Sequence, residues 1–401
     1  MNSFSLMALA ECCEIVSGAT PSTSVEEYWD GAVCWATPKD LSDLDGHYIS
    51  DTPRKLTTEG LNSCSASILP PNSVLFSSRA PIGHVAINEV PMATNQGFKS
   101  FVPKADVIDA KYLFHWLRTN RTYLESLGNG ATFKEVSKAV VAKIKVPVPP
   151  LFEQRRIAAI LDQADDLSAK RREALAELDK LSQAIFVEMF GDPVANPRGW
   201  AVKKLRDIST KILSGTTPNG GSQVYVSDGV LFLRSQNVWK NSLLLDDVAY
   251  IDEDTHSKMR KSGLKNKDIL ITKTGRINTE NSSLGRAAIF TGKDNSANIN
   301  GHVYLVRLNE GEVHKFVLYI LTTDAYREYI RSVCVGGIDK RQVNKEHLEE
   351  FPIIYPPFDL QHRFAASLES IEKQKSVFRA QLDELEHMFS SLQHRAFRGE
   401  L

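Results

Sequence analysis

The chain has 401 residues, of which 42% are hydrophobic and 24% are charged. This length and composition are typical of a folded protein of two or three domains, and they exclude a disordered or fibrous chain. The 48 Lys and Arg residues balance 49 Asp and Glu residues, which excludes a uniformly basic DNA-packaging protein. Any nucleic-acid surface is therefore expected to be a local basic patch.

Cysteine usage and hydropathy indicate a cytoplasmic protein. The five cysteines show no C-x-x-C spacing and the histidines no metal-ligand spacing, so we expect reduced thiols and no metal. Residues 1–16 lack a basic segment, and no window approaches 18 consecutive apolar residues. We therefore expect neither secretion nor membrane insertion.

The sequence contains one long internal repeat. Residues 146–161 read VPVPPLFEQRRIAAIL, residues 352–368 read PIIYPPFDLQHRFAASL, and their double prolines lie 207 positions apart. Near the front of each half, S-G-A-T-P from Ser17 matches S-G-T-T-P from Ser214. The repeat predicts two similar domains.

Between these anchors, short β-rich runs alternate with turn-forming residues. They predict strands at residues 74–76, 84–87, 229–233, 269–272, 287–290 and 303–308. One amphipathic helix per copy is expected to follow, at residues 111–127 and 315–333. We predict an α+β fold for each domain.

Each copy ends in a run with the alternating three- and four-residue spacing of a coiled-coil seam. The seam positions in the first run are Ile157, Ile160, Ala164, Leu167, Ala174, Leu178, Leu181 and Ile185. Those in the second run are Phe364, Leu368, Ile371, Phe378, Leu382, Leu385, Phe389, Leu392 and Ala396. Arg171 and Lys375 are the exceptions in the two seams.

Each long helix could pack on its own domain. A chain that leaves the first domain along a helix must turn back to reach the second, however, which favours antiparallel pairing of the two helices. We therefore predict a first domain at residues 1–151, a helix at 152–191, a second domain at 192–357 and a second helix at 358–401.

Sequence motifs for catalysis are missing. A phosphate-binding G-x-x-x-x-G-K-[ST] loop and a G-x-S-x-G elbow do not occur. Tyr355-Pro356-Pro357-Phe358 resembles the [Asn/Asp/Ser]-Pro-Pro-[Tyr/Phe] motif of adenine N6-methyltransferases, but a tyrosine stands where that chemistry needs a hydrogen-bond acceptor. The prolines are better explained as fixing the entry of the long helix. We expect the chain to be non-catalytic.

Basic residues gather in two segments. Residues 111–145 and residues 260–286 each carry seven Lys or Arg against two acidic residues. Phosphate contacts and base reading use Lys, Arg, Asn, Gln, Ser and Thr projected from loops or helices. The candidate DNA-contacting residues are Thr37, Lys39, Ser77, Arg79, Lys134, Lys138, Gln236, Asn237, Lys273, Thr274, Arg276, Arg286, Lys340 and Arg341.

This organisation resembles the specificity subunit of Type I restriction-modification systems. The resemblance covers essentially the whole chain and rests on the repeated Pro-Pro-x-x-x-Gln segment, the heptad helix that follows it, the chain length and the final A-F-R-G-E-L at residues 396–401. The second copy departs from the family pattern, with Asp359-Leu360-Gln361 where Glu-Gln is expected.

The resemblance implies two target-recognition domains that each read one half of a bipartite double-stranded DNA target. The two helices would set the unread gap and dock two modification (methyltransferase) subunits, with Gln154, Arg156, Gln361 and Arg363 as candidate partner contacts. Restriction/translocase subunits would join the complex. S-adenosylmethionine, ATP and magnesium would bind to those partners, so no cofactor is expected in this chain.

Two other classes of function stay open on the sequence alone. A stand-alone DNA methyltransferase or nuclease is disfavoured by the missing cofactor loops. A coiled-coil scaffold with no DNA role is disfavoured by two basic domains that keep one framework and diverge mainly in one loop.

Overall fold

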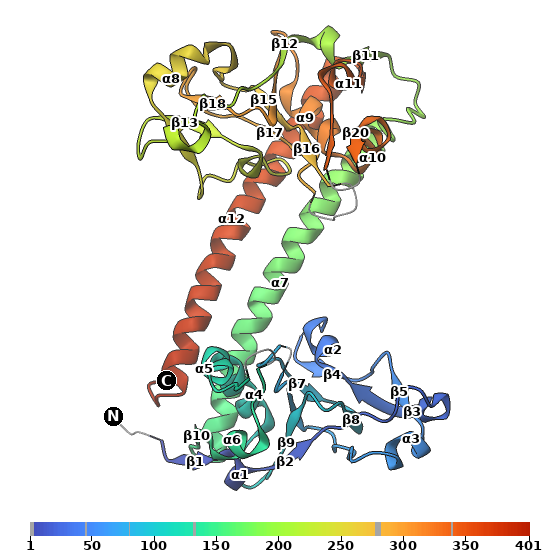
Figure 1. The fold of residues 1–401 in the computed structure, drawn as a ribbon, viewed down its shortest axis with the longest axis vertical. Helices are drawn as coiled ribbons and strands as arrows, with labels where there is room; N and C mark the ends of the chain where they lie inside the picture. The colour runs from blue at the N-terminus through green and yellow to red at the C-terminus, as the bar shows by residue number, and fades with distance from the viewer. Residues whose placement is uncertain (1–3, 45, 80, 131–133, 277–281, 338–339) are drawn as a thin grey trace. The chain divides into compact units, whose positions relative to one another are not determined.

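A computed structural model describes residues 4–44, 46–79, 81–130, 134–276, 282–337 and 340–401. The chain divides into two compact units, each containing part of both long helices, α7 (Leu151–Phe190) and α12 (Phe358–Ala396) (Figure 1). Unit 1 comprises Met1–Ala174 and Phe378–Leu401, and unit 2 comprises Leu175–Val377. Both units mix strands and helices, so the predicted α+β class is confirmed.

Unit 1 contains two sheets and one separate strand pair. The main sheet has the order β2 (Cys13–Ser17), β9 (Lys99–Pro103), β6 (Val74–Phe76), β7 (Val85–Asn88) and β4 (Tyr48–Ile49). The second has the order β5 (Lys55–Leu56), β3 (Trp29–Ala36) and β8 (Met92–Thr94), while β1 (Leu6–Ala8) pairs with β10 (Lys145–Pro147). The helices of this unit are α1 (Leu9–Cys12), α2 (Pro38–Ser42), α3 (Thr58–Asn62), α4 (Ala110–Thr119), α5 (Arg121–Ser126) and α6 (Lys138–Lys143).

Unit 2 repeats this plan. Its main sheet has the order β12 (Ser209–Ser214), β19 (Val303–Leu308), β15 (Ile269–Thr272) and β17 (Ala287–Ile289). The other sheets are β14 (Ala249–Ile251), β13 (Val230–Leu233) and β18 (Ala297–Ile299); β16 (Thr274–Gly275), β21 (Lys340–Gln342) and β20 (Val335–Gly337); and β11 (Val202–Lys204) with β22 (Pro352–Ile354). Its helices are α8 (Glu253–Lys258), α9 (His314–Thr322), α10 (Asp324–Val333) and α11 (Lys345–Glu349).

The internal repeat is confirmed at the level of single hydrogen bonds. The amide of Gln154 donates to the carbonyl oxygen of Pro149 at 2.8 Å, and that of Gln361 donates to the carbonyl oxygen of Pro356 at 2.8 Å. The strands predicted at residues 74–76 and 269–272 are β6 and β15, which lie inside the two main sheets. Their residues are all buried because both faces of each sheet are covered.

The single amphipathic helix predicted in each copy is two helices in the structure. In unit 1 the break is at Asn120, whose backbone leaves the helical region between α4 and α5. In unit 2 the extended residue Thr323 separates α9 from α10, and its hydroxyl accepts a hydrogen bond from the backbone N–H of Tyr326. Hydrophobic spacing continues across both breaks because the paired helices pack on one core, so periodicity alone could not locate them.

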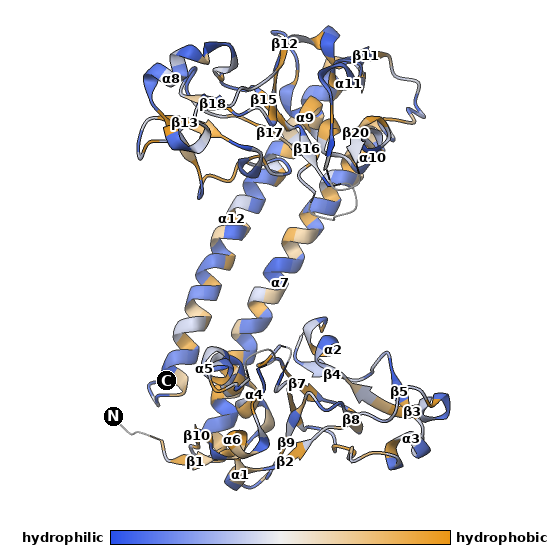
Figure 2. Ribbon diagram, viewed as in Figure 1, coloured by the Kyte–Doolittle hydropathy of each residue, from blue (hydrophilic) through white to orange (hydrophobic). Residues whose placement is uncertain are grey.

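The long helices pair in antiparallel fashion within each unit. In unit 1, Arg172 of α7 forms an ion pair with Glu386 of α12 at 2.6 Å, and Arg156 donates to the backbone oxygen of Leu401 at 3.1 Å. In unit 2, the ammonium of Lys375 lies 2.7 Å from the carboxylate of Asp179. Figure 2 shows hydrophobic and hydrophilic residues interspersed along both helices.

The prediction that Leu167 and Leu181 belong to the buried seam of α7 is wrong. Leu167 and Leu181 are 50% and 46% exposed, whereas Ser168 and Ser182 are buried. Each serine hydroxyl donates to the backbone oxygen four residues earlier, at 3.2 Å and 3.1 Å, so a small side chain faces the core without an unpaired polar group. The two leucines are therefore left on the outer face of α7.

All five cysteines are free in the structure, four of them buried. Among the residues that the structure describes, no helix is long and apolar enough to cross a membrane.

Two glycines of the repeated S-G-x-T-P motif lie against backbone. A Cβ atom on Gly18 would lie 2.0 Å from the carbonyl oxygen of Asn95, and one on Gly215 would lie 2.3 Å from that of Ile299. We expect Gly18→Ala to destabilise unit 1 and Gly215→Ala to destabilise unit 2, each by about 3 kcal/mol, because backbone cannot move aside cheaply. Urea unfolding measures this, with Gly337→Ala as the control because its Cβ would meet no atom within 4 Å. Equal stability of all three variants would contradict it.

Candidate nucleic-acid interface

In unit 1, two chain segments predicted to contact DNA are joined by backbone pairing. The loop after β6 meets the turn after α5, where Arg79 and Asn129 both form β-bridges with Glu135. The backbone N–H of Val136 donates to the carbonyl oxygen of Ser78 at 2.9 Å. This loop–turn joint brings Arg79 together with the segment that carries the exposed side chains of Lys134 and Lys138, which were predicted separately.

Helix α2 lies next to the loop–turn joint of unit 1. A Cβ atom on Gly97 would lie 3.0 Å from a ring carbon of Pro38, the first residue of α2, and 3.5 Å from a side-chain carbon of Arg79. Thr37 caps α2, with its hydroxyl 2.8 Å from the carboxylate of Asp40. Lys39 is exposed and forms an ion pair with Asp43 at 2.5 Å. Thr37 therefore has a structural task, whereas Lys39 points to solvent.

The prediction that Ser77 contacts DNA is wrong. Its side chain is fully buried. The hydroxyl donates to the carbonyl oxygen of Pro81 at 2.7 Å and accepts from the backbone N–H of His84 at 2.8 Å. Ser77 instead holds the ends of the loop that presents Arg79.

Unit 2 builds the same joint with different side chains. Strand β16 pairs with β21, which forms a hairpin with β20, so Thr274 lies opposite Gln342 and Gly275 opposite Arg341. The backbone N–H of Val343 donates to the carbonyl oxygen of Lys273 at 2.9 Å, matching the Val136–Ser78 bond. The side chain of Lys340 is outside the part of the chain that the structure describes.

Helix α10 adds arginines that the sequence interpretation missed. Arg327 and Arg331 line one small hollow together with Arg276. Arg331 pairs with Glu328, and Arg341 donates to the carbonyl oxygen of Cys334, directly after α10, at 3.3 Å. The four-residue spacing of two arginines, offset from the buried Tyr326 and Ile330, could have indicated this basic face.

Arg286 is held in place beside this arginine group. Its guanidinium lies 3.7 Å from the centre of the Trp239 ring, and its Nε donates to the carbonyl oxygen of Ser282 at 3.0 Å. Burial, together with the charge of Arg327, lowers the pKa of Arg286. We refer to Arg276, Arg286, Arg327, Arg331 and Arg341 as the arginine cluster.

The neighbouring pair Gln236 and Asn237 divides between the surface and the interior. Asn237 is 1% exposed, and its amide group donates to the carbonyl oxygens of Leu244 and Asp247, so its assignment as a DNA contact is corrected. Gln236 is exposed and donates to the carboxylate of Asp247 at 2.7 Å. Asn237 was misassigned because its surface loop gives no sequence sign of the inward side chain.

The repeated glutamines are internal anchors, so their assignment as partner contacts is also corrected. Gln154 is fully buried: its amide oxygen accepts from the backbone N–H of Asp109 at 2.8 Å, and its amide nitrogen donates to the carbonyl oxygen of Val107 at 2.9 Å. Gln361 is buried at the matching position of α12. Arg156 and Arg363 are both exposed. Arg156 pairs with Glu153 at 2.7 Å and donates to the backbone oxygen of Leu401, and the assignment of both arginines as partner contacts stays a prediction.

Tyr355 of the methyltransferase-like tetrapeptide has structural partners. Its hydroxyl donates to the carboxylate of Glu312 at 2.9 Å, and its ring packs edge-on against Phe358 at 5.6 Å. Burial, together with Glu312, raises the pKa of Tyr355 to about 12. These contacts fix the start of α12.

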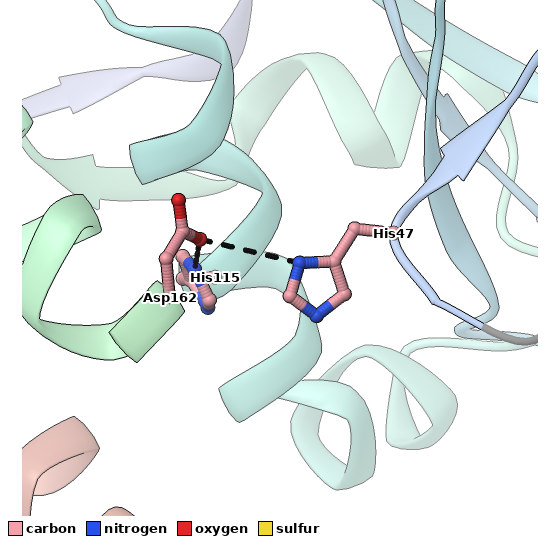
Figure 3. A group of neighbouring side chains, drawn as sticks. All are labelled: His47, His115 and Asp162. Atoms are coloured by element: carbon pink, nitrogen blue, oxygen red, sulfur yellow. Dashed lines mark hydrogen bonds and ion pairs between the residues drawn. The ribbon is translucent and has the colours of Figure 1, made fainter. Parts of the chain in front are cut away.

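A buried ionic network fastens the first domain to α7 within unit 1 (Figure 3). His115 of α4 is fully buried, and its Nε2 lies 2.7 Å from the carboxylate of Asp162 on α7, which also pairs with Lys111 at 2.9 Å. The Nδ1 of His47 lies 4.0 Å from the same oxygen of Asp162, and its Nε2 lies 2.5 Å from Asp165.

His47, His115 and Asp162 have the donor types of a metal site. The surrounding charged side chains nevertheless explain this network without a bound metal ion. Lys111 and Arg118 already neutralise Asp162 and Asp165. The expectation that the chain binds no metal stays a prediction.

Replacing Asp162 is expected to destabilise the contact between α4 and α7 in unit 1. Burial raises the pKa of Asp162, but hydrogen bonds and charges from His115 and Lys111 outweigh this and lower it to about 2. The ionised carboxylate therefore contributes stability above pH 4, which is lost as the pH falls towards 2. We expect Asp162→Ala to cost about 2 kcal/mol at pH 7 and to flatten the stability profile between pH 4 and pH 2.

Urea unfolding at several pH values checks this expectation, with Asp166→Ala, an exposed residue of the same helix, as the control. A steep, wild-type profile in Asp162→Ala would contradict it. An increase in wild-type thermal stability on adding zinc would contradict the metal-free account.

Comparison with known proteins identifies the class to which this fold belongs. A family model described as the Type I restriction modification DNA specificity domain matches residues 1–178 and 197–387. The chain therefore belongs to this family.

Individual relatives agree with this assignment. The chain is 29% identical to the type I restriction enzyme MjaIX specificity subunit of Methanocaldococcus jannaschii, over 97% of this chain and 91% of that protein. It is 28% identical to the EcoR124I/EcoR124II specificity subunit of Escherichia coli over 44% of each chain. In fold it is similar to the S subunit of a type I system from M. genitalium (TM-score 0.58, 14% identity, 99% and 96% coverage). A chain from a study of type I R-M complex assembly gives a TM-score of 0.60 at 18% identity, with 100% and 99% coverage.

Proposed function

We propose that this chain is the DNA specificity subunit of a type I restriction-modification complex, in which each unit reads one half of a bipartite target. One observation carries the proposal: both units build the same loop–turn joint and place different polar side chains on it. A shared backbone keeps the position of the reading surface, and different side chains read different bases.

The arginine cluster supplies the phosphate contacts of unit 2. Arg276 directly follows β16, and it lines one hollow with Arg327 and Arg331 of α10. Arg286 directly precedes β17 and is influenced by the charge of Arg327, and Arg341 of β21 lies opposite Gly275. Within the cluster, Arg331 pairs with Glu328, and Arg276 is an exposed side chain beside it. In unit 1, Lys39, Arg79, Lys134 and Lys138 have the corresponding role.

The long helices set the unread gap and dock two modification subunits. Leu167 and Leu181 on α7, with Val377 and Met388 on α12, are exposed apolar side chains on this pair of helices. Such residues are costly to leave in water and favour a helical partner. S-adenosylmethionine, ATP and magnesium bind to the partner subunits, and this chain performs no catalysis itself.

Salt-dependent binding to a random-sequence duplex tests the phosphate role. Each phosphate contact contributes about 0.9 to the slope of log affinity against log salt, so Arg276→Gln/Arg327→Gln/Arg331→Gln should reduce that slope by about 2–3. The control, Lys258→Gln/Lys261→Gln/Lys293→Gln, makes the same change of charge in unit 2 at exposed positions outside the cluster. Equal slopes in the two triple variants would contradict the assignment, and a wild-type chain without salt dependence would support a scaffold instead.

A further inference from the structure

Glu135 and Gln342 occupy one position of the repeated framework. They lie 207 residues apart, as do the double prolines. Glu135 is bridged by backbone to Asn129 and Arg79, and Gln342 is bridged to Val335 and Thr274. The next residue in each unit donates its backbone N–H across the joint at 2.9 Å. The register against the loop after β6 or β15 is therefore the same, whereas the pairing on the other side differs by one residue, because Asn129 precedes Glu135 by six positions and Val335 precedes Gln342 by seven.

The carboxylate of Glu135 is fixed but not covered. Lys99, whose side chain is only 10% exposed, lies 3.2 Å from one of its oxygens, and Arg79 lies 3.8 Å from the other. The Glu135 side chain itself is 38% exposed. A buried lysine thus holds an acidic group at the centre of an otherwise basic joint that includes Arg79, Lys134 and Lys138.

An acidic group in this place repels phosphate, but its partly exposed carboxylate can accept a hydrogen bond from a base. In the major groove, Glu accepts from the exocyclic amino group of cytosine, whereas Gln can both donate to and accept from adenine. Gln342 is exposed, and its side-chain amide nitrogen donates a long hydrogen bond of 3.4 Å to the side-chain oxygen of Asn344. The two units therefore present different base-reading groups from one backbone position.

We propose that Glu135 and Gln342 are equivalent specificity-determining residues, each reading one base in its own half of the target. The proposal rests on the proposed function, because it requires that the joints face DNA. Glu135 accepts a hydrogen bond from a base amino group while Lys99 and Arg79 hold its carboxylate in place. Gln342 makes the corresponding contact in the second half.

Selection of bound sequences from a random duplex pool tests the proposal, using the full chain with its modification subunits. We expect Glu135→Gln to reduce discrimination at one position of one half-site by about 10- to 100-fold and to leave the other half-site unchanged. Gln342→Glu should do the same in the other half-site only. Glu125→Gln, which removes another exposed carboxylate paired with an arginine in unit 1, is the matched control and should change neither.

The possible outcomes distinguish failure of the proposed function from failure of this inference. A wild-type complex that selects no bipartite sequence would overturn the proposed function. A wild-type complex that selects one, with both half-sites unchanged in Glu135→Gln and Gln342→Glu, would overturn this inference alone. Thermal unfolding of the same variants identifies a purely structural role for the Glu135–Lys99 pair, which would lower stability without changing any base preference. Substitution of the neutral Gln342 removes no ion pair. Gln342→Glu therefore tests the inference even if Glu135→Gln folds poorly.

Discussion

Exchanging residues 1–151 for the matching domain of another specificity subunit is expected to change one half of the methylated DNA target completely. The other half should be unchanged, because the loop–turn joint of unit 2 is built entirely from residues of that unit. Exchanging residues 192–357 in the same way should change only the other half. Mapping of methyladenine positions in cells measures both results, and a change in both halves from either exchange would contradict modular reading.

The structure sets one condition on this exchange. The end of α12 packs on the first domain: the rings of Tyr112 and Phe397 lie 5.4 Å apart, and Ala396 is fully buried in the same core. The donor domain should therefore keep an aromatic residue at the position of Tyr112. The original chain with Tyr112→Ala controls for loss of this contact, which would lower stability rather than alter the half-site.

Removing one heptad from each long helix is expected to shorten the unread gap by about 3 base pairs. Seven residues shorten a helix by about 10 Å, and about 34 Å of B-DNA corresponds to one turn of 10 base pairs. We would delete residues 173–179 from α7 and 369–375 from α12, which removes Asp179, Glu372 and Lys375 together. No member of that ion-pair group is then left buried without a partner.

An insertion of one heptad in each helix is the matched control and should lengthen the gap by the same amount. Both half-site sequences should stay as in the wild type, since neither change touches a loop–turn joint. A gap of unchanged length in both variants, with both complexes folded and methylating, would show that the helices do not measure distance along DNA.

The sequence predicted the architecture because the repeat and the heptads are long-range, redundant signals. The strands β6, β15 and β19 lie where alternating and β-branched residues indicated them. The seam of α12 was also correct, including the buried exception Lys375, which is satisfied by Asp179 and Glu372. In α7 the apolar spacing gave two wrong seam positions. Ser168 and Ser182, whose hydroxyls donate to the helix backbone, occupy the buried seam in place of Leu167 and Leu181.

The candidate site was predictable in part. The basic loops were found from charge and composition, but their direct pairing depends on contacts between segments more than 50 residues apart, such as Arg79 with Glu135. Side-chain direction was the main source of error. Ser77, Asn237, Gln154 and Gln361 have the residue types of binding groups, yet all four point inward to satisfy backbone groups.

The most direct test of the central claim is a genome-wide map of methyladenine in cells that carry the matching modification subunit, with and without this chain. Our account predicts a two-part motif with an unread gap that appears only when the chain is present. Methylation that is unchanged by the chain, with the modification subunit shown to be folded and bound to it, would contradict the account.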